Sequence, residues 1–286
     1  MMKIIESPRE GMQGFSRIIP TGEKVSYINR LLRVGFDTVE IGSIVSPRVI
    51  PQMADSLDVL KKLDITGTTS NLMFLAVHAR GAEILAAIDE ITHISYPFAF
   101  SPTFLKLNVN STVAQSLDTA ETVINLCNKR GKQAVIYISM AFGNPYGDPW
   151  SIDTLVEWVV KLRQAGARII PLSNVSMEID AALISEVYST LIPLFPEVEF
   201  GLHLHTANQG WYEKVLAAYN AGCRRFDGVI NGWGGCPMAG KEMLGNLKTE
   251  NLIEFAALKG NPLNIFQPDL EEAYRMAGAV FVNNEY

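Results

Sequence analysis

Residues 198–230 read VEFGLHLHTANQGWYEKVLAAYNAGCRRFDGVI and decide the fold, because they hold one complete strand–helix–strand unit. Residues 198–205 form a short apolar run typical of a strand, and residues 209–221 have the spacing of a helix. Residues 225–230 form a second short run. A strand, a helix and another strand in this order predict two parallel strands joined by a crossover helix.

The same alternation continues along the rest of the chain. Strands are expected at residues 3–6, 38–42, 64–71, 91–96, 133–139, 168–172, 198–205 and 225–230. Helices are expected near residues 23–34, 55–62, 77–88, 111–130, 151–165, 178–192, 209–221, 245–258 and 268–282. Eight successive strand–helix units predict an α/β fold, specifically a (β/α)8 TIM barrel. Without a long linker or a break in composition, we expect a single TIM-barrel catalytic domain over residues 1–286.

Composition narrows the classes of partner. The chain has 286 residues, of which 48% are hydrophobic, and a net charge of −6 without long charge runs, which argues against nucleic acid as the main partner. No apolar segment has membrane-spanning length and no signal sequence is evident. Three cysteines without CxxC spacing fit reduced thiols. We therefore expect a cytoplasmic protein without a membrane partner, and a homodimer through barrel helices is plausible.

His203 and His205 are the first candidate site. In an extended strand, residues i and i+2 share a face, so both imidazoles would point into one small volume. Neutral imidazoles are common metal ligands, and a strand holds them rigidly. The pattern predicts a metal site, and the alternative is a pair of buried, hydrogen-bonded histidines. For the other two histidines, His78 and His93, we expect structural roles.

The barrel prediction selects further candidates, because catalytic groups gather at the C-terminal ends of barrel strands. Arg9 and Glu10 follow the first strand, and Glu40 lies near the end of the second. Other polar residues at this rim are Ser139, Asn174, His205 and Asn231. A carboxylate would complete a two-histidine metal site, and a neighbouring guanidinium could stabilise an oxyanion. The alternative for Arg9 and Glu10 is an ordinary solvated loop.

Two positions after the last strand complete the candidate set. Cys236 belongs to the glycine-rich stretch 231–237, which could fold over the site, so its thiol would act as an acid or base or simply pack. The same stretch resembles a phosphate cradle, but its spacing matches no specific fingerprint. Asn246 offers an amide oxygen as a metal ligand. Its alternative role is the N-cap of the next helix.

With these residues in this order, the sequence resembles 3-hydroxy-3-methylglutaryl-CoA lyase and the related divalent-metal barrel lyases and acyl-CoA-condensing synthases. The segments that carry the resemblance run in order along most of the chain: residues 6–13, 39–40, 43–48, 51–55, 106–110, 143–146, 203–205, 234–237 and 245–247. Ser-Pro-Arg at 46–48, Pro-Gln-Met at 51–53 and Gly-Gly-Cys-Pro at 234–237 favour the lyase branch.

The resemblance implies roles for individual residues. It implies metal ligands at Glu10, His203, His205 and Asn246. It further implies Arg9 as the oxyanion stabiliser, Glu40 as an active-site carboxylate and Cys236 as the loop thiol. The implied cofactor is Mg²⁺ or Mn²⁺, with Zn²⁺ as the alternative. The implied reaction is a retro-Claisen cleavage of a 3-hydroxy-3-methyl acyl-CoA to acetyl-CoA and acetoacetate.

The chain departs from the family pattern at three polar positions. Glu10, Asn174 and Thr206 stand where the family has an aspartate or another acidic residue. These departures leave two alternatives open. One is a related aldolase or condensing synthase acting on a hydroxy or keto acid, and the other is a barrel that binds metal or acyl-CoA without catalysing.

Overall fold

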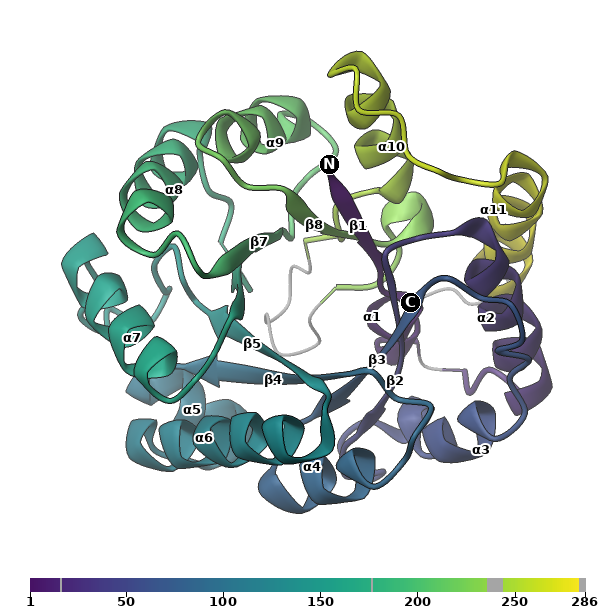
Figure 1. Ribbon diagram of the computed structural model, residues 1–286, viewed down its shortest axis with the longest axis horizontal. Helices are drawn as coiled ribbons and strands as arrows, with labels where there is room; N and C mark the ends of the chain where they lie inside the picture. Colours follow the sequence, from purple (N-terminus) through teal and green to yellow (C-terminus); the bar gives the residue numbers. More distant parts are fainter. Residues whose placement is uncertain (16, 176, 236–243, 283–286) are drawn as a thin grey trace.

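Strands and helices alternate around a closed ring in the computed structural model of the chain, which describes residues 1–15, 17–175, 177–235 and 244–282 (Figure 1). The strands are β1 (Lys3–Glu6), β2 (Thr38–Ile44), β3 (Asn71–Ala76), β4 (His93–Ala99), β5 (Gln133–Ser139), β6 (Ile169–Ser173), β7 (Glu199–His203) and β8 (Arg225–Gly228). All neighbours pair in parallel, and β1 pairs with both β2 and β8, which closes the barrel. The predicted (β/α)8 barrel is confirmed.

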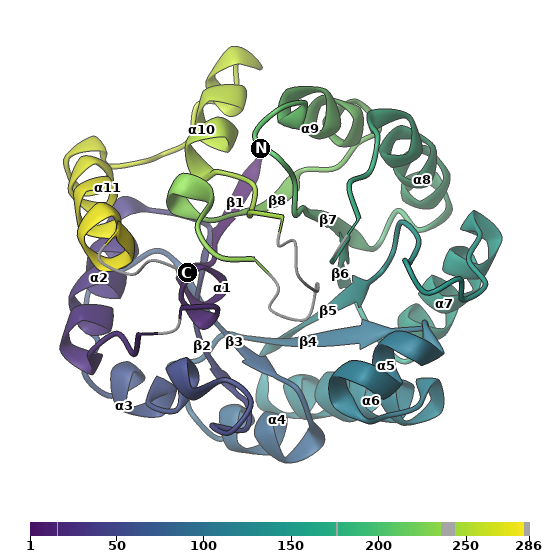
Figure 2. The same cartoon turned by 180° about the vertical axis from the view of Figure 1, so that it is seen from behind.

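Helices surround this ring on all sides in both views (Figures 1 and 2). The helices are α1 (Pro8–Gln13), α2 (Thr21–Val34), η1 (Pro51–Met53), α3 (Ser56–Leu60), α4 (Ala79–Ala86), α5 (Pro102–Val109), α6 (Val113–Arg130), α7 (Ile152–Gln164), α8 (Ala181–Leu194), α9 (Trp211–Asn220), η2 (Ile230–Gly232), α10 (Thr249–Leu258) and α11 (Gln267–Val282). Gly35 and Gly131 end α2 and α6 in the left-handed conformation, as glycine after a helix predicts. None of the described helices is long and apolar enough to cross a membrane.

The third strand was predicted in the wrong place. Residues 64–71 were expected to be extended, but the strand is Asn71–Ala76. Asp64 accepts a hydrogen bond from the Thr66 amide at 3.1 Å, and Gly67 has a φ of +72°, so the chain turns there. The following run Leu72–Ala76 is covered on both faces, and such a strand lacks the alternation that marks a half-exposed one.

Other boundaries also differ from the prediction. β7 ends at His203 and β8 at Gly228, each two residues earlier than expected. The helix expected from residue 245 begins at Thr249. Two short helices, α1 and α5, were not predicted, and each follows a strand directly and begins with proline. Proline suits this first turn because its missing N–H would have no helical partner.

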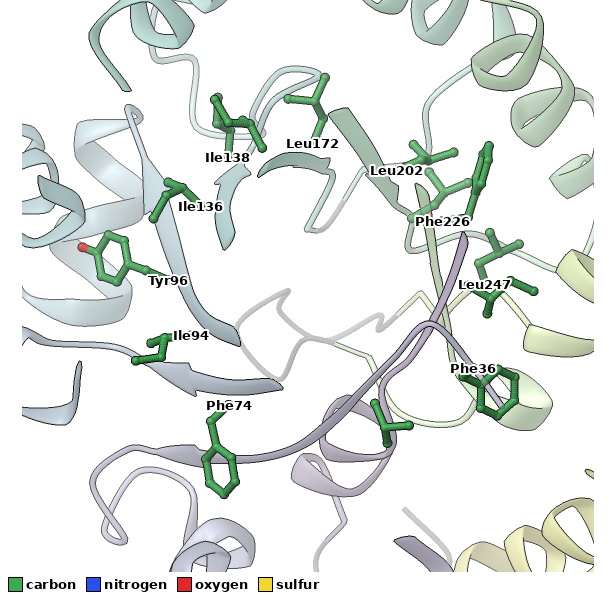
Figure 3. Packing of buried hydrophobic residues seen from close by; sticks show 14 of the residues in the cluster. Phe36, Phe74, Ile94, Tyr96, Ile136, Ile138, Leu172, Leu202, Phe226 and Leu247 are labelled. Carbon is green, nitrogen blue, oxygen red and sulfur yellow. The ribbon is translucent and has the colours of Figure 1, made fainter. Parts of the chain in front are cut away.

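Side chains pack in two layers around the strands. Inside the barrel, a small buried cluster contains Ile5, Met73, Val135, Tyr137 and Ile169. Residues that alternate with these on the same strands face the helices and belong to the large outer core. Figure 3 shows members of this outer core, among them Phe74, Ile138 and Phe226. The barrel interior is thus filled by this cluster. The polar side chains of the candidate site lie above the cluster, at the rim.

Candidate active site

The segment after β1 carries two buried charges into the barrel mouth. Pro8 starts α1, and Arg9 and Glu10 follow in its first turn. Arg9 is only 7% exposed and Glu10 only 5%. An ordinary solvated loop would leave both side chains in water, so that alternative is wrong. Burying charges is costly unless they are paired, which directs attention to their partners.

Glu10 and the two histidines converge on one point. His203 ends β7, His205 follows two residues later, and their ring centroids lie 5.1 Å apart. One ligand atom from each of Glu10, His203 and His205 lies within 4.8 Å of the others. Leu202 and Leu204 are buried on the opposite face, as the alternation predicted. The one-methylene longer side chain of Glu10 therefore reaches the histidines.

His203 is oriented by a carboxylate that the sequence analysis missed. Its Nδ1 lies 3.0 Å from Oδ2 of Asp227 on β8, and the Tyr137 hydroxyl donates to the same oxygen at 2.6 Å. With Nδ1–H held by Asp227, Nε2 is left as the metal-binding nitrogen, an arrangement that metal-bound histidines commonly show. The available signal was an acidic residue, Asp227, on the inward face of an otherwise buried strand.

The chemistry of the donor set fits a divalent metal. Within the described part of the chain, the buried Nδ1 of His205 makes no hydrogen bond. Burial, aided by the neighbouring His203, lowers the pKa of His205 to about 4, which keeps its imidazole neutral. A neutral ring with an unpaired buried nitrogen is what a ligand requires, whereas a structural histidine would find a partner.

Arg9 pairs with both carboxylates of the site, Glu10 and Glu40. Its Nη1 lies 2.5 Å from Glu10, and its Nε and Nη2 donate to Oε2 of Glu40 at 3.0 and 2.6 Å. Burial opposes ionisation of both acids and raises the pKa of Glu40. For Glu10, burial is outweighed by Arg9 and the two histidines, so its pKa is lowered. Glu10 is therefore the ionised carboxylate of the cluster.

Gln13, one turn further along α1, ties these charges together. Its Nε2 donates to Oε1 of Glu10 at 2.7 Å, and its Oε1 accepts from Nη1 of Arg9 at 2.9 Å. Ser95 donates to the other oxygen of Glu40 at 3.1 Å. The guanidinium and both carboxylates are thus fixed before any ligand binds, which is the preorganisation that electrostatic catalysis needs.

Asn246 lies beside His205 rather than at a helix terminus. The two residues form an isolated antiparallel bridge, and the Asn246 side chain donates from Nδ2 to the Trp233 carbonyl at 2.7 Å. That bond fixes which end of the amide is the oxygen. Lys248 is the N-cap residue of α10, so the N-cap alternative for Asn246 is wrong.

The remaining candidates separate into three groups. Ser139 lines the cavity above the histidines, whereas Asn174 and Asn231 do not, and Glu40 lies behind Arg9. His78 caps α4 by accepting from the Gly81 amide, and His93 is buried beside Thr92, so both have structural contacts as expected. Cys236 falls outside the described residues, and its role stays a prediction.

A cavity of about 870 Å³ opens above this cluster. Its floor includes Arg9, Glu10, His203 and His205, and its walls are mostly apolar. Much of one wall comes from α5, through Leu105, Leu107 and Val109, and another part from the segment that follows β2. The sequence did not indicate the α5 wall, because α5 itself was not predicted. The arrangement suits a ligand with a polar, metal-chelating end and an apolar middle.

Comparison with known proteins agrees with this geometry. The HMGL-like family profile matches residues 2–277. An (R)-citramalyl-CoA lyase of Chloroflexus aurantiacus is 30% identical over 272 residues, covering 91% of this chain and 84% of that protein. A hydroxymethylglutaryl-CoA lyase of Bacillus subtilis is 30% identical over 247 residues, covering 86% and 81%.

Solved structures show the same relationship. An HMG-CoA lyase from Acinetobacter baumannii, solved in complex with coenzyme A and 3-methylmalate, superposes with a TM-score of 0.89 at 27% identity. The match covers 98% of this chain and 91% of that one. The resemblance seen in the sequence is confirmed, and the chain belongs to the HMGL-like family of carbon–carbon lyases.

Proposed function

We propose that this protein cleaves a 3-hydroxy-3-methyl acyl-CoA, with hydroxymethylglutaryl-CoA as the first candidate substrate, to acetyl-CoA and acetoacetate. One observation carries the proposal: Glu10, His203 and His205 meet at one point beneath an open cavity, with the Arg9 guanidinium beside them. The names of the relatives, lyases of two acyl-CoA thioesters, support the substrate class.

The metal ligands in this proposal are Glu10, His203, His205 and Asn246, and the ion is Mg²⁺ or Mn²⁺. One carboxylate, one amide and two imidazoles suit these ions, and Zn²⁺ is the alternative. When bound, a divalent ion would lower the pKa of the substrate alcohol and orient it in the site. Asp227 keeps His203 in the tautomer that leaves Nε2 for the ion.

The reaction moves one proton and one electron pair. The alcohol loses its proton, its carbon becomes the ketone of acetoacetate, and the electrons of the broken carbon–carbon bond form the acetyl-CoA enolate. Arg9 is placed to stabilise that oxyanion, because its guanidinium lines the cavity beside the proposed metal ligands. Protonation of the enolate carbon completes acetyl-CoA. Cys236 remains a candidate for a proton-transfer role.

The cavity gives further support for a thioester substrate. Its apolar walls, including Val49, Leu107 and Val109, suit the aliphatic part of an acyl carrier. Arg80 lines the cavity and is exposed, so its guanidinium is available for an anionic group at the other end of the ligand. A homodimer stays a prediction that light scattering would test. The buried free thiols of Cys127 and Cys223 support the proposed cytoplasmic location.

The first experiment measures turnover with and without the metal-binding histidine. Purified protein with Mg²⁺ or Mn²⁺ should release acetoacetate from hydroxymethylglutaryl-CoA, and citramalyl-CoA should be assayed in parallel. His203→Ala should reduce kcat/KM by at least about 100-fold, because it removes a ligand. His93→Gln changes a buried histidine at the start of β4, the opposite end of the barrel, and should keep metal-dependent turnover.

Absence of turnover by the wild-type protein on both thioesters with all three metals would refute the specific activity. Tight metal and thioester binding without product would instead support the alternative of a non-catalytic binding barrel.

A further inference from the structure

His205 is held unusually firmly for a residue beyond the end of a strand. The regular β6–β7 ladder ends where Ser173 pairs with His203, and His205 lies two residues further on. Its side chain is nevertheless only 2% exposed. A metal ligand in a free segment would have to be ordered at each binding event, which would weaken affinity. Some other part of the chain must therefore fix its backbone.

The side chain of Asn174 supplies this restraint from the β6 side. Its Oδ1 accepts from the His205 amide at 2.8 Å, and its Nδ2 donates to the His205 carbonyl at 2.7 Å. Nδ2 also donates to the Met177 carbonyl at 2.7 Å. Asn174 is 3% exposed. Its side-chain amide makes the two hydrogen bonds to the His205 backbone that a neighbouring strand would make, and it thereby continues the β6–β7 pairing to His205.

A second restraint comes from the segment before α10. The Leu247 amide donates to the Leu204 carbonyl at 3.0 Å, and the Thr206 amide donates to the Gly245 carbonyl at 2.9 Å. His205 and Asn246 face each other between these two bonds. The backbone from 204 to 206 is therefore pinned on both sides, and the pinning sets two of the proposed ligands next to each other.

Thr206 anchors the same backbone through its hydroxyl. The Thr206 Oγ1 accepts from the buried Lys214 ammonium at 2.8 Å and donates to Glu178 at 3.0 Å. Lys214 and Glu178 form an ion pair at 2.9 Å. Thr206 does not line the cavity above the His203–His205 cluster, so we assign it the role of an anchor for this segment and not of a ligand.

These contacts require an amide at position 174. An asparagine offers one acceptor for the His205 N–H and one donor group for two carbonyls, whereas a carboxylate offers acceptors only. An aspartate would place a negative oxygen against the carbonyls of Met177 and His205 in a buried site, which is costly. Resting on the proposed metal site, we propose that in this chain Asn174 is a positioning residue that holds His205 ready for metal through both ends of its amide.

The test measures Mn²⁺ binding to the full-length protein, without substrate, by counting free Mn²⁺ by electron paramagnetic resonance. The wild-type protein should bind one ion per chain, and Asn174→Asp should weaken binding at least about tenfold, as loss of a contact that orients a ligand commonly does. Asn174→Ala should also weaken binding. Absorption spectra of the Co²⁺-loaded proteins should differ between wild type and Asn174→Asp, because the ligand geometry changes.

Asn144→Asp is the matched control. Its side chain also accepts from two amides, those of Tyr146 and Asp148, and donates to the Asp148 carbonyl, but it holds no proposed ligand. This variant should lower Tm yet leave Mn²⁺ affinity within about twofold of the wild-type value. If Asn174→Asp fails to fold, Asn174→Ala alone provides the test, and an affinity equal to that of the wild-type protein overturns the positioning role.

The outcomes separate the two proposals. A wild-type protein that binds no divalent ion overturns the proposed metal site and with it the role of Asn174. A wild-type protein that binds Mn²⁺, together with folded Asn174→Asp and Asn174→Ala variants of equal affinity and unchanged Co²⁺ spectra, overturns the positioning role alone.

Discussion

Single residues beside the proposed metal site set the orientation of its ligands. Asp227 accepts hydrogen bonds from His203 and from Tyr137 at one oxygen, and its charge is compensated by the buried Arg225 on the same strand. Burial alone would lower the pKa of His203, but Asp227 and Glu10 outweigh it, so that pKa is raised. A more basic imidazole is a better electron donor to a metal ion.

Asp227→Asn should weaken Mn²⁺ binding by about 10- to 100-fold, because the amide neither stabilises the His203 Nδ1–H as well nor carries the compensating charge. Tyr137→Phe removes the other hydrogen bond to the same oxygen but keeps the ring that packs against His203, so its effect should be smaller. Isothermal titration calorimetry on both folded variants measures the difference. Equal affinities of Asp227→Asn and the wild-type protein would contradict this role.

At the scale of one element, β2 orients Glu40, a candidate active-site side chain. Its pairing with β3 shifts by one residue between Glu40 and Gly42, which changes which face the side chains use. Glu40 comes just before this shift, pairs with the inward-facing Met73 and points inward to Arg9. Gly42 has no side chain at the point where a Cβ would lie 2.6 Å from the Phe74 ring and 2.9 Å from the Ser56 Cβ. The glycine permits the close approach of β2, β3 and α3.

Gly42→Ala should destabilise the fold by about 1–3 kcal/mol, because the added methyl overpacks a filled region. Displacement of β2 should also reduce kcat/KM through Glu40. Gly278→Ala is the matched control, since a Cβ at this position in α11 meets no neighbour within 4 Å. That substitution should raise stability slightly, as helical Gly→Ala changes do. Urea unfolding measures both, and an equally stable Gly42→Ala variant would refute the packing argument.

At the scale of the whole molecule, Glu6 connects the first strand to the C-terminal part of the chain. Its Oε2 accepts from the Thr249 hydroxyl and its Oε1 from the Ile230 amide at 3.1 Å. These bonds connect β1 to α10 and to the segment after β8, beside the β1–β8 pairing that closes the barrel. Glu6 is fully buried, and burial raises its pKa to about 8, despite both hydrogen bonds and with a further contribution from Glu250.

This shift makes the barrel closure sensitive to pH. A carboxyl whose pKa is raised on folding binds more protons in the folded state, so its contribution is complete below the unfolded pKa of 4.5 and is lost as pH rises towards 8. Glu6→Gln stays neutral, keeps an acceptor for the Ile230 amide and offers its side-chain NH2 as a donor to the Thr249 hydroxyl. Its stability relative to the wild-type protein should therefore rise between pH 5 and pH 9, by on the order of 3 kcal/mol.

Thermal unfolding at several pH values measures this difference. Glu199→Gln is the control of opposite sign, because Lys3 and Arg225 outweigh burial there and lower the pKa of Glu199. That variant should be less stable than the wild-type protein near pH 7, and the deficit should shrink as pH falls. A constant difference between Glu6→Gln and the wild-type protein across pH 5–9 would rule out titration of Glu6.

The sequence by itself determined the features that depend on local spacing. Period-2 and period-3.6 patterns predicted eight strand–helix units, and alternation placed His203 and His205 on one face and Leu202 and Leu204 on the other. The rim rule for parallel barrels then added Arg9 and Glu10 to the histidines. Each of these inferences needs only residues close together in the chain, or one rule about which end of a strand carries function.

Only the tertiary structure decided the contacts that cross the barrel. Barrel closure and strand register set Asp227 beneath His203, Asn174 against the His205 backbone and Asn246 opposite His205. The third strand was misplaced because a strand buried on both faces has no alternation to distinguish it from a helix. Distances between side chains on different strands follow from register and shear, which no local pattern encodes, so the positioning of the ligands emerges only when the barrel closes.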